Sequence, residues 1–429
     1  MVVSHRWAAL SAALGIGVLV WVPARGGEPD PKLCVECHLK STPSVVAQWQ
    51  ASGHAKAKPE VTCMDCHKAK ESEPDAYKHH DAFIATIVSP KRCEPCHAEQ
   101  VKQFAASRHA EAASITGASV FLVEMIEGHA AAVSGCQQCH GSTVAAGKEG
   151  KLDEKTWPNA GVGRINPDGS KGCCSACHAR HSFARAQARR PENCGRCHLG
   201  PDHPQIEIYK ESKHGVLFDA HDQELKLDSK KWVVGVDYTA APTCATCHMS
   251  ATPKQPFSHD VGLRLSWDLR SVISTRRAGM AKKRMSMQEV CFNCHSTKYI
   301  ESFYKQFDGV VRLYNEKFAK PAKAIMDQLT ADKLLTPTPF DEPIEWRYYE
   351  LWHHQGRRAR HGAAMMGPDY VHWHGFYDVA RTFYMEFLPE AERLKKGVTD
   401  KVRASDEHAW LKGLSKEELD KVDKAYKGQ

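Results

Sequence analysis

The feature that most constrains this chain is the motif Cys-x-x-Cys-His, which occurs eight times in 429 residues. At the observed frequencies of cysteine and histidine, chance would give roughly 0.04 such motifs. Two thiols at this spacing can form thioethers to both vinyl groups of a haem while the adjacent imidazole binds the iron. The motif residues are Cys34, Cys37, His38; Cys63, Cys66, His67; Cys93, Cys96, His97; Cys136, Cys139, His140; Cys174, Cys177, His178; Cys194, Cys197, His198; Cys244, Cys247, His248; and Cys291, Cys294, His295.

Zinc knuckles or disulfides are the alternative interpretation of these cysteines. A tetrahedral zinc site would need two Cys-x-x-Cys pairs per ion, and it gives no reason for a histidine behind every pair. We therefore expect eight c-type haems, with the eight motif histidines as iron ligands. Cys173 is the odd cysteine, and inert packing of its thiol is favoured over an intermolecular bridge.

Haem attachment of this kind takes place outside the cytoplasm, so a targeting segment is expected at the N-terminus. Residues 1–26 have the pattern of a signal peptide: Arg6 is basic, residues 7–22 are apolar, and residues 24–26 offer small side chains for cleavage. The apolar stretch is short for a membrane span, and an uncleaved anchor is the alternative. We expect the mature protein to be soluble and periplasmic, or otherwise extracytoplasmic.

The formal net charge of +7 does not predict a nucleic-acid partner. Each haem carries two propionates, and those of eight haems would make the loaded protein net negative.

The fold class that we expect is mainly α with extensive loops. With about 50 residues for each haem, the chain cannot bury a large core of its own around every cofactor, so the porphyrins must form much of the core. Residues 27–300 would wrap around eight haems. Residues 301–429 would form a helical region, because apolar residues recur there at helical spacing, and it would pack on the haem domain and on neighbouring subunits.

Further histidines are candidates for the second axial ligand of each iron. Three stand in a repeat of "WQASGHAKA", "FAASRHAEA" and "YKESKHGVL", where a helix and its return could bring an imidazole to the far side of a haem. Their pairing with particular haems stays open, because a distal histidine can come from far along the chain. The candidates are His54, His109 and His214 in the repeat, His80 with His79 as its alternative, His181, His259, and His361 with His353 and His354 nearby.

Most motifs have a histidine close behind them, and the fourth motif does not. No histidine lies between His140 and His178. A haem without a sixth ligand can bind a small molecule, so the His140 haem is the candidate open site, with upstream His129 as the alternative sixth ligand.

Several long segments resemble the octahaem hydroxylamine oxidoreductase family over roughly Cys34 to Arg381. They are "WPNAGVGRINPDGSKG", "CHARHSF", "ARRPENCGRCHLGPDHPQIEIYKESKHG", "FSHDVGLRLSW" and "GRRARHGAAMMGPDYVHWHGFYDVAR". The resemblance implies that the fourth haem, at His140, is catalytic and that Asp202 and His203 lie over its iron. It also implies that Tyr370 of a neighbouring subunit is bonded covalently to the catalytic porphyrin, within a homotrimer.

These observations favour an enzyme that oxidises hydroxylamine, a small nitrogenous substrate, to nitric oxide or nitrite. A carboxylate beside an imidazole can accept the protons released, although His203 as another haem ligand is the alternative. Electrons would leave through seven bis-histidine haems to a soluble or membrane-bound cytochrome. The alternatives are an ammonia-forming nitrite or hydroxylamine reductase, a hydrazine dehydrogenase, and an electron conduit with eight six-coordinate irons. For Tyr370, the alternative is an ordinary aromatic core residue.

Overall fold

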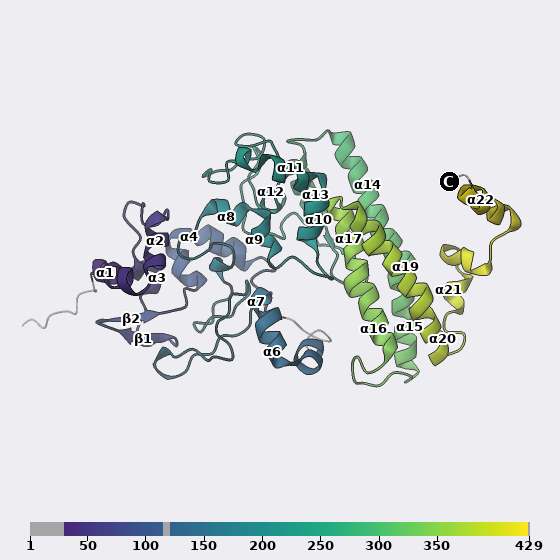
Figure 1. Ribbon diagram of the computed structural model, residues 1–429, viewed down its shortest axis with the longest axis horizontal. Helices are drawn as coiled ribbons and strands as arrows, with labels where there is room; N and C mark the ends of the chain where they lie inside the picture. Colours follow the sequence, from purple (N-terminus) through teal and green to yellow (C-terminus); the bar gives the residue numbers. More distant parts are fainter. Residues whose placement is uncertain (1–29, 115–120, 428–429) are drawn as a thin grey trace, which may run out of the picture.

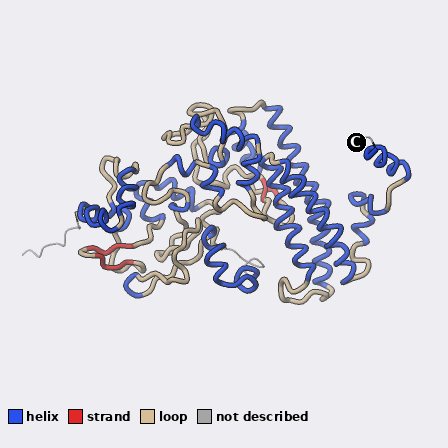
Figure 2. The backbone as a smooth tube through the Cα atoms, in the orientation of Figure 1, coloured by secondary structure: helices blue, strands red, loops and turns tan. Residues whose placement is uncertain are grey.

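The computed structural model describes residues 30–114 and 121–427, so the expected signal peptide at residues 1–26 lies outside the described residues. The chain is mostly helical with long loops, which confirms the expected fold class (Figure 2). Two small antiparallel sheets interrupt it, one of β1 (Ala76–His79) and β2 (Ala82–Ala85), the other of β3 (Trp267–Asp268) and β4 (Thr275–Arg276). Within the described ranges, no helix is long and apolar enough to span a membrane.

Each Cys-x-x-Cys-His motif lies in a helix or starts within one. A helical turn places residues three apart on one face, so both cysteines of a motif can reach the same haem. The motif elements are α1 (Pro31–Ser41), α3 (Cys63–His67), α4 (Pro90–Ala105), η2 (Ala132–Cys136) with α7 (Gln137–His140), η4 (Cys174–Ala176), α9 (Pro191–Gly195), α12 (Cys244–His248) and α13 (Met280–Cys291). Between them lie α2 (Pro43–Ala51), η1 (Leu122–Gly128), α6 (His129–Ala131), η3 (Lys148–Gly150), α8 (Arg185–Arg189), α10 (Gln205–Glu211), α11 (Lys213–His221) and η5 (Asp222–Leu225).

Three long helices lie side by side at the end of the molecule away from the N-terminal motif helices (Figure 1). The first consists of α14 (Thr297–Tyr314), η6 (Asn315–Ala319) and α15 (Lys320–Ala331). The second consists of α16 (Pro343–Tyr349), η7 (Glu350–Gln355) and α17 (Gly356–Met365). The third consists of α18 (Pro368–Val371), η8 (His372–Tyr377), α19 (Asp378–Thr382), η9 (Phe383–Phe387) and α20 (Leu388–Leu394).

Helical periodicity explains how the first of these helices packs. The buried residues of α14 recur every three or four positions, as Ile300, Tyr304, Phe307, Val311 and Tyr314. Such a stripe stabilises a helix by packing one face against its neighbours.

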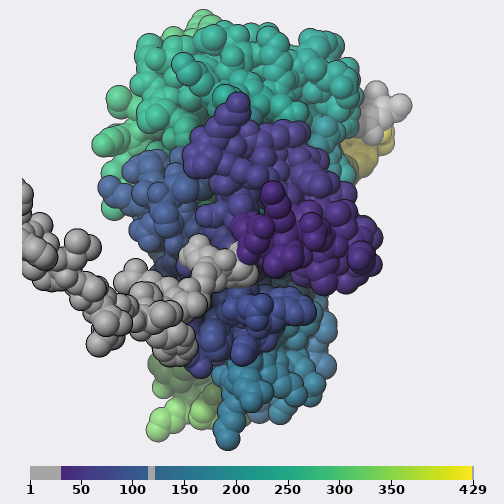
Figure 3. Space-filling view, turned by 90° about the vertical axis from the view of Figure 1, so that its left-hand side faces the viewer, coloured from purple at the N-terminus to yellow at the C-terminus, as the bar shows by residue number. Residues whose placement is uncertain are grey.

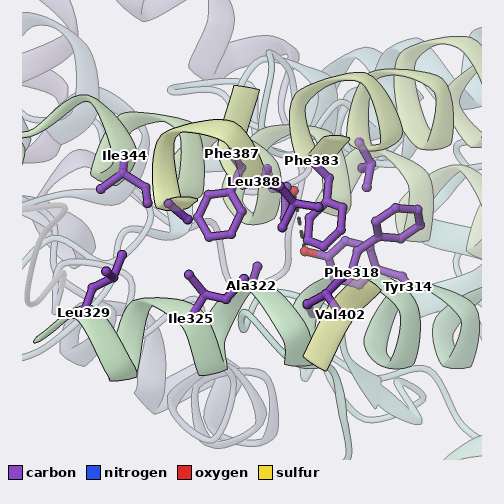
Figure 4. Packing of buried hydrophobic residues seen from close by; sticks show 14 residues of the cluster. Tyr314, Phe318, Ala322, Ile325, Leu329, Ile344, Phe383, Phe387, Leu388 and Val402 are labelled. Carbon is purple, nitrogen blue, oxygen red and sulfur yellow. Dashed lines mark hydrogen bonds between the residues drawn. The ribbon is translucent and has the colours of Figure 1, made fainter. Parts of the chain in front are cut away.

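Among the described residues, the largest apolar core lies among these helices, where Phe383 packs against Phe318 and Phe387 lies opposite Ile325 (Figure 4). The haem-attachment part has a second sizeable cluster around Phe218, Trp232 and Tyr238, whereas toward the N-terminus a cluster consists of Ala69, Ala76 and Ala85 alone. Small side chains at the centre of a cluster bury little area. The difference between the two parts agrees with porphyrins forming the core in the N-terminal part.

Replacing Phe383 with alanine should therefore lower the free energy of unfolding by about 3–5 kcal/mol, because its fully buried ring would leave a cavity. Urea denaturation followed by far-ultraviolet circular dichroism measures this loss. Met385 lies in the same helix but is 63% exposed, and Met385→Ala should change stability by less than about 0.5 kcal/mol. Equal losses in the two variants would contradict this account of the core.

The last elements are α21 (Asp400–Ala404), η10 (Asp406–Lys412) and α22 (Lys416–Lys427). Buried His408 attaches η10 to the helices through a hydrogen bond of 2.8 Å between its Nδ1 and the Tyr384 hydroxyl. Beyond this attachment, α22 stands apart from the body in Figure 1. The N-terminal motif helices lie at the opposite end and face the viewer in Figure 3.

Candidate functional site

Several motif histidines are held in the tautomer that a metal ligand needs. The Nδ1 atom lies 2.9 Å from the Ala85 carbonyl oxygen in His67, 3.2 Å from that of Val261 in His248, and 3.3 Å from that of Ala112 in His140. A carbonyl only accepts, so each Nδ1 carries the proton and donates it. The lone pair on Nε2 is then free to bind iron.

Burial keeps other motif histidines neutral as well. It lowers the pKa of His178 to about 4, with neighbouring His259 adding to the effect. It likewise lowers the pKa of His198 to about 4, with His109 contributing. Since an imidazole binds a metal only when it is unprotonated, both environments favour ligation.

Six motif histidines face a second imidazole at nearly the same distance. Their ring centroids are 6.1–6.4 Å apart. An iron bound on both sides at about 2.0 Å, the length of a metal–imidazole bond, separates two ring centroids by about 6.3 Å. These spacings therefore match a bis-histidine haem at each pair: His38 and His79, His54 and His97, His67 and His181, His109 and His198, His178 and His259, and His214 and His295.

The pairs are not local in sequence. The three repeat histidines face motifs other than the one directly before them: His54 faces His97, His109 faces His198, and His214 faces His295. The segment that follows a motif thus packs against a different haem position. Each such histidine ties two parts of the chain together.

At the first motif, the structure places His79 opposite His38, whereas the sequence analysis selected His80. His79 ends strand β1, while His80 occupies the hairpin turn with a left-handed backbone at φ 51°. His80 packs on the ring of His79 at 4.7 Å. The strand end, and not the turn, therefore supplies the imidazole that faces the motif.

His361 is the remaining candidate distal ligand. It is buried on α17, and its pKa lies well below the usual value because of burial and the nearby guanidinium of Arg360. Of the motif histidines other than His140, His248 has no ring contact within the described ranges. No described contact joins His361 to His248, and the imidazoles that act on the pKa of His361 are those of His203 and His198, so the distal ligand of the His248 haem stays open.

The motif cysteines also define an order in space that the sequence does not give. Electrostatic interactions between thiols of different motifs link motifs one, two, three, five, six, seven and eight in a row, with motif four beside motif six. The interacting pairs are Cys34 and Cys63, Cys66 and Cys93, Cys93 and Cys174, Cys177 and Cys194, Cys139 and Cys197, Cys194 and Cys244, and Cys247 and Cys291. Motif four is thus a branch on a continuous row.

The fourth motif differs from the six paired motifs on its distal side. Among residues 30–114 and 121–427, no ring contact involves His140. His129, the alternative sixth ligand, has a side chain 63% exposed and pairs with Glu124 at 2.8 Å. The charged groups that act on His140 are instead His203 and Asp202, although burial is the main cause that lowers its pKa.

A short loop between α9 and α10 brings Asp202 and His203 to this place. Gly200 starts the loop with a left-handed backbone at φ 94°, and Pro204 caps α10. Cys139 of motif four contacts the Arg196 carbonyl of motif six at 3.8 Å, so the loop behind motif six lies beside motif four. The His203 Nδ1 atom is 3.5 Å from Asp202 Oδ1.

His203 also lies near motif six, since its ring centroid is 6.1 Å from that of His198. The same distance separates His198 from His109. The Nδ1 edge of His198 faces the loop of His203, 3.4 Å from Gln205 Oε1. This arrangement favours His109 as the imidazole opposite Nε2 of His198, so that His203 is free to act beside the fourth motif.

The structure adds a group that the sequence analysis did not select as catalytic. Arg357 Nη1 is 3.3 Å from Asp202 Oδ2 and 3.1 Å from His353 Nε2. The His353 ring stacks on Tyr349 at 4.3 Å. His353, Arg357 and His361 are spaced by four residues, so they lie on one face of the second long helix, and this spacing was the available sequence signal.

Tyr370 lies on α18 and is not joined to Asp202 or His203 of its own chain by any described contact. Its ring packs on His374 at 5.3 Å, and burial followed by the carboxylates of Glu207 and Glu211 raises its pKa. Gly362 allows the close approach of α17 to this segment, because a Cβ there would lie 2.8 Å from the Tyr370 carbonyl carbon.

Cys173 is buried, and its sulfur lies 3.2 Å from the Ser175 hydroxyl. This position agrees with inert packing.

Comparisons with known proteins identify the family. Residues 58–343 match a family model described as seven times multi-haem cytochrome CxxCH, and the matched range contains the second to the eighth motif. A curated relative from Kuenenia stuttgartiensis, named as a probable nitrite reductase-hydroxylamine oxidoreductase fusion protein, is 24% identical over 375 residues. The alignment covers 73% of this chain but 39% of that relative, so the chain spans well under half of its length.

Two solved structures share the fold. One, titled "Hypothetical multiheme protein", gives a TM-score of 0.71 at 26% identity and covers 89% of this chain and 98% of that one. The other, a reducing HAO-like protein complex of Kuenenia stuttgartiensis, gives a TM-score of 0.63 at 22% identity and covers 87% of each chain. The comparisons confirm the resemblance found in the sequence. The chain is a multihaem c-type cytochrome of the hydroxylamine-oxidoreductase-like kind, and it belongs to the multi-haem cytochrome CxxCH family.

Proposed function

We propose that this protein carries eight c-type haems and oxidises hydroxylamine at the haem attached through Cys136, Cys139 and His140. One observation carries the proposal: of the two motif histidines that face no second imidazole in the described ranges, His140 and His248, it is His140 that lies beside Asp202 and His203. An iron with a free coordination position supplies a binding site for a small nitrogen compound and an acceptor for its electrons.

The residues beside this position suit the protons of the reaction. Oxidation of hydroxylamine to nitric oxide releases three electrons and three protons. Asp202 and His203 can accept protons at the substrate and pass them on, because a carboxylate orients the imidazole next to it and stabilises the imidazole once it is protonated. The Asp202 side chain is 20% exposed and that of His203 is 31% exposed, so released protons have a route to water.

The order of the motifs supports electron export. Motif four adjoins motif six, from which the row continues toward motif one at one end and motif eight at the other. Seven bis-histidine haems on this row, with His79 in place of His80, would carry electrons to an external cytochrome. We further propose an extracytoplasmic location, in keeping with the leader-like residues 1–26, and a homotrimer.

The reverse reaction, reduction of nitrite or hydroxylamine to ammonia, is the second candidate. The curated relative carries both activities in its name, and one structural neighbour is titled as reducing. Hydrazine oxidation would use the same site residues. A conduit with eight six-coordinate irons differs from all three because it would bind no small ligand.

The decisive experiment is a ligand titration of the purified holoprotein. Cyanide, nitrite or hydroxylamine should perturb one haem in eight, measured by optical and electron paramagnetic resonance spectra, because one iron lacks a sixth protein ligand. A protein in which no haem responds would be an electron conduit. A response from several haems would contradict the histidine pairs.

A further inference from the structure

We propose that Arg357 is a specificity-determining residue, which makes the open site electrically neutral by pairing with Asp202 and thereby favours an uncharged nitrogenous substrate over an anion. This inference rests on the proposed function, because it concerns the substrate of the same site. It adds Arg357 to the site and a preference for uncharged over anionic substrates.

The Asp202–Arg357 pair is enclosed. Nη1 of Arg357 lies 3.3 Å from Oδ2 of Asp202, and the two side chains are 14% and 20% exposed. The Arg357 Nε donates to the Arg270 carbonyl oxygen at 2.9 Å, and its guanidinium lies 5.1 Å from the centroid of the Trp352 ring. These contacts hold the guanidinium in one position, so its charge is fixed beside the carboxylate.

Other charged groups nearby are engaged elsewhere. Arg358 pairs with Asp378 at 3.2 Å, and Arg270 pairs with Asp268 at 3.0 Å. Buried Arg360 donates to the Ser274 hydroxyl and to backbone carbonyls, including that of Ser271 at 3.1 Å. Arg357 is therefore the cation that balances Asp202.

The imidazoles on the same helix add no charge. A guanidinium only donates, so Nε2 of His353 accepts the bond from Arg357 and His353 is neutral, with its proton on Nδ1. Burial, followed by Arg357, lowers the pKa of His353 to about 2. Burial also lowers the pKa of His354. Among these groups, one carboxylate and one guanidinium then carry charge, and the two balance each other.

The chain contains a matched pair for control. Asp378 and Arg358 form an ion pair of nearly the same length, 3.2 Å, and Arg358 is adjacent in sequence to Arg357. Changes in this pair alter the same types of charge outside the proposed site, because Arg358 lies on α17 next to Arg357 while Asp378 lies on α19. Arg358→Gln and Asp378→Asn should leave ligand binding unchanged.

The test measures the affinity of the ferric holoprotein for nitrite, an anion, and nitric oxide, a neutral ligand. Asp202→Asn leaves Arg357 unbalanced and should tighten nitrite binding by about tenfold or more, whereas Arg357→Gln leaves the carboxylate unbalanced and should weaken it by about tenfold or more. The double variant restores neutrality and should return to within about threefold of wild type, as should Arg357→Lys, which keeps the charge. Nitric oxide affinity should stay within about threefold in every variant, because the ligand carries no charge.

A pyridine haemochromogen assay of haem content verifies that each variant is assembled. If Arg357→Gln does not assemble, the two single variants Asp202→Asn and Arg357→Lys test the proposal. Nitrite affinities that move in the same direction in both single variants, or that stay unchanged in Asp202→Asn, would overturn the charge selection while the open haem remains. Binding of neither ligand to the wild-type protein would overturn the proposed function itself.

Discussion

Replacing Asp202 with asparagine is expected to lower hydroxylamine turnover by about 10²–10⁴-fold, the usual contribution of a positioned general base. Asparagine keeps the shape of the side chain and can still contact Arg357, but its amide does not accept a proton. His203 would also lose the carboxylate that lies 3.5 Å from its Nδ1. The loss should appear mainly in kcat, because proton removal belongs to the chemical step.

Steady-state kinetics with an artificial electron acceptor measures this loss, with haem content and ferrous spectra verifying assembly. Asp378→Asn is the matched control, because Asp378 also pairs with an arginine of α17, at 3.2 Å. It should retain turnover within about twofold, as a substitution away from the site normally does. Unchanged turnover in Asp202→Asn would assign proton transfer to another group, with His203 the next to test.

The residues that attach each haem could be predicted from the sequence, whereas the pairing of each distal histidine with a particular motif histidine could not. The motif sets the haem attachment, because two cysteines and a histidine within five residues form one local unit. The distal ligands were predicted as residue types with their partners left open. A pair such as His67 and His181 depends on how distant segments pack, for which sequence spacing gives no rule.

The site shows the same limit. The gap behind His140 and the Asp202–His203 dipeptide are visible in the sequence. Arg357 was hidden in the basic run "GRRARHG", where three arginines look alike. They differ only through tertiary contacts, because Arg357 faces Asp202, Arg358 faces Asp378, and Arg360 is buried among backbone carbonyls. Among the three arginines, only Arg357 lies four residues from both His353 and His361, which places it on the same face of the helix as these histidines.

In the proposed function, the direction of the reaction depends on Tyr370. The family resemblance implies that a tyrosine of one subunit bonds covalently to the catalytic porphyrin of the next, which makes the ring more electron-rich and favours withdrawal of electrons from the substrate. Nearby Trp373 and Tyr377 are 58% and 52% exposed, and a cluster of exposed aromatic rings is typical of a protein interface.

If Tyr370 forms this bond, denaturing electrophoresis of the holoprotein should show covalent multimers that survive reduction, most simply trimers of a closed ring. Tyr370→Phe should abolish them, restore an ordinary ferrous haem spectrum and shift activity toward reduction of nitrite or hydroxylamine. Tyr377→Phe removes a hydroxyl from the same exposed surface and should leave the multimers intact. Mass spectrometry of haem peptides would locate the link, as a His140 peptide joined to a Tyr370 peptide.

The opposite result is equally informative. Monomers alone on the gel of the wild-type holoprotein, with a normal ferrous spectrum, would remove the reason to expect an electron-rich porphyrin. The ammonia-forming reductase would then be the better assignment, although Asp202, His203 and Arg357 would keep their positions beside His140. Since the same site residues serve either direction, the electronic state of the porphyrin decides between them, and the covalent bond to Tyr370 is the property of this chain that would set that state.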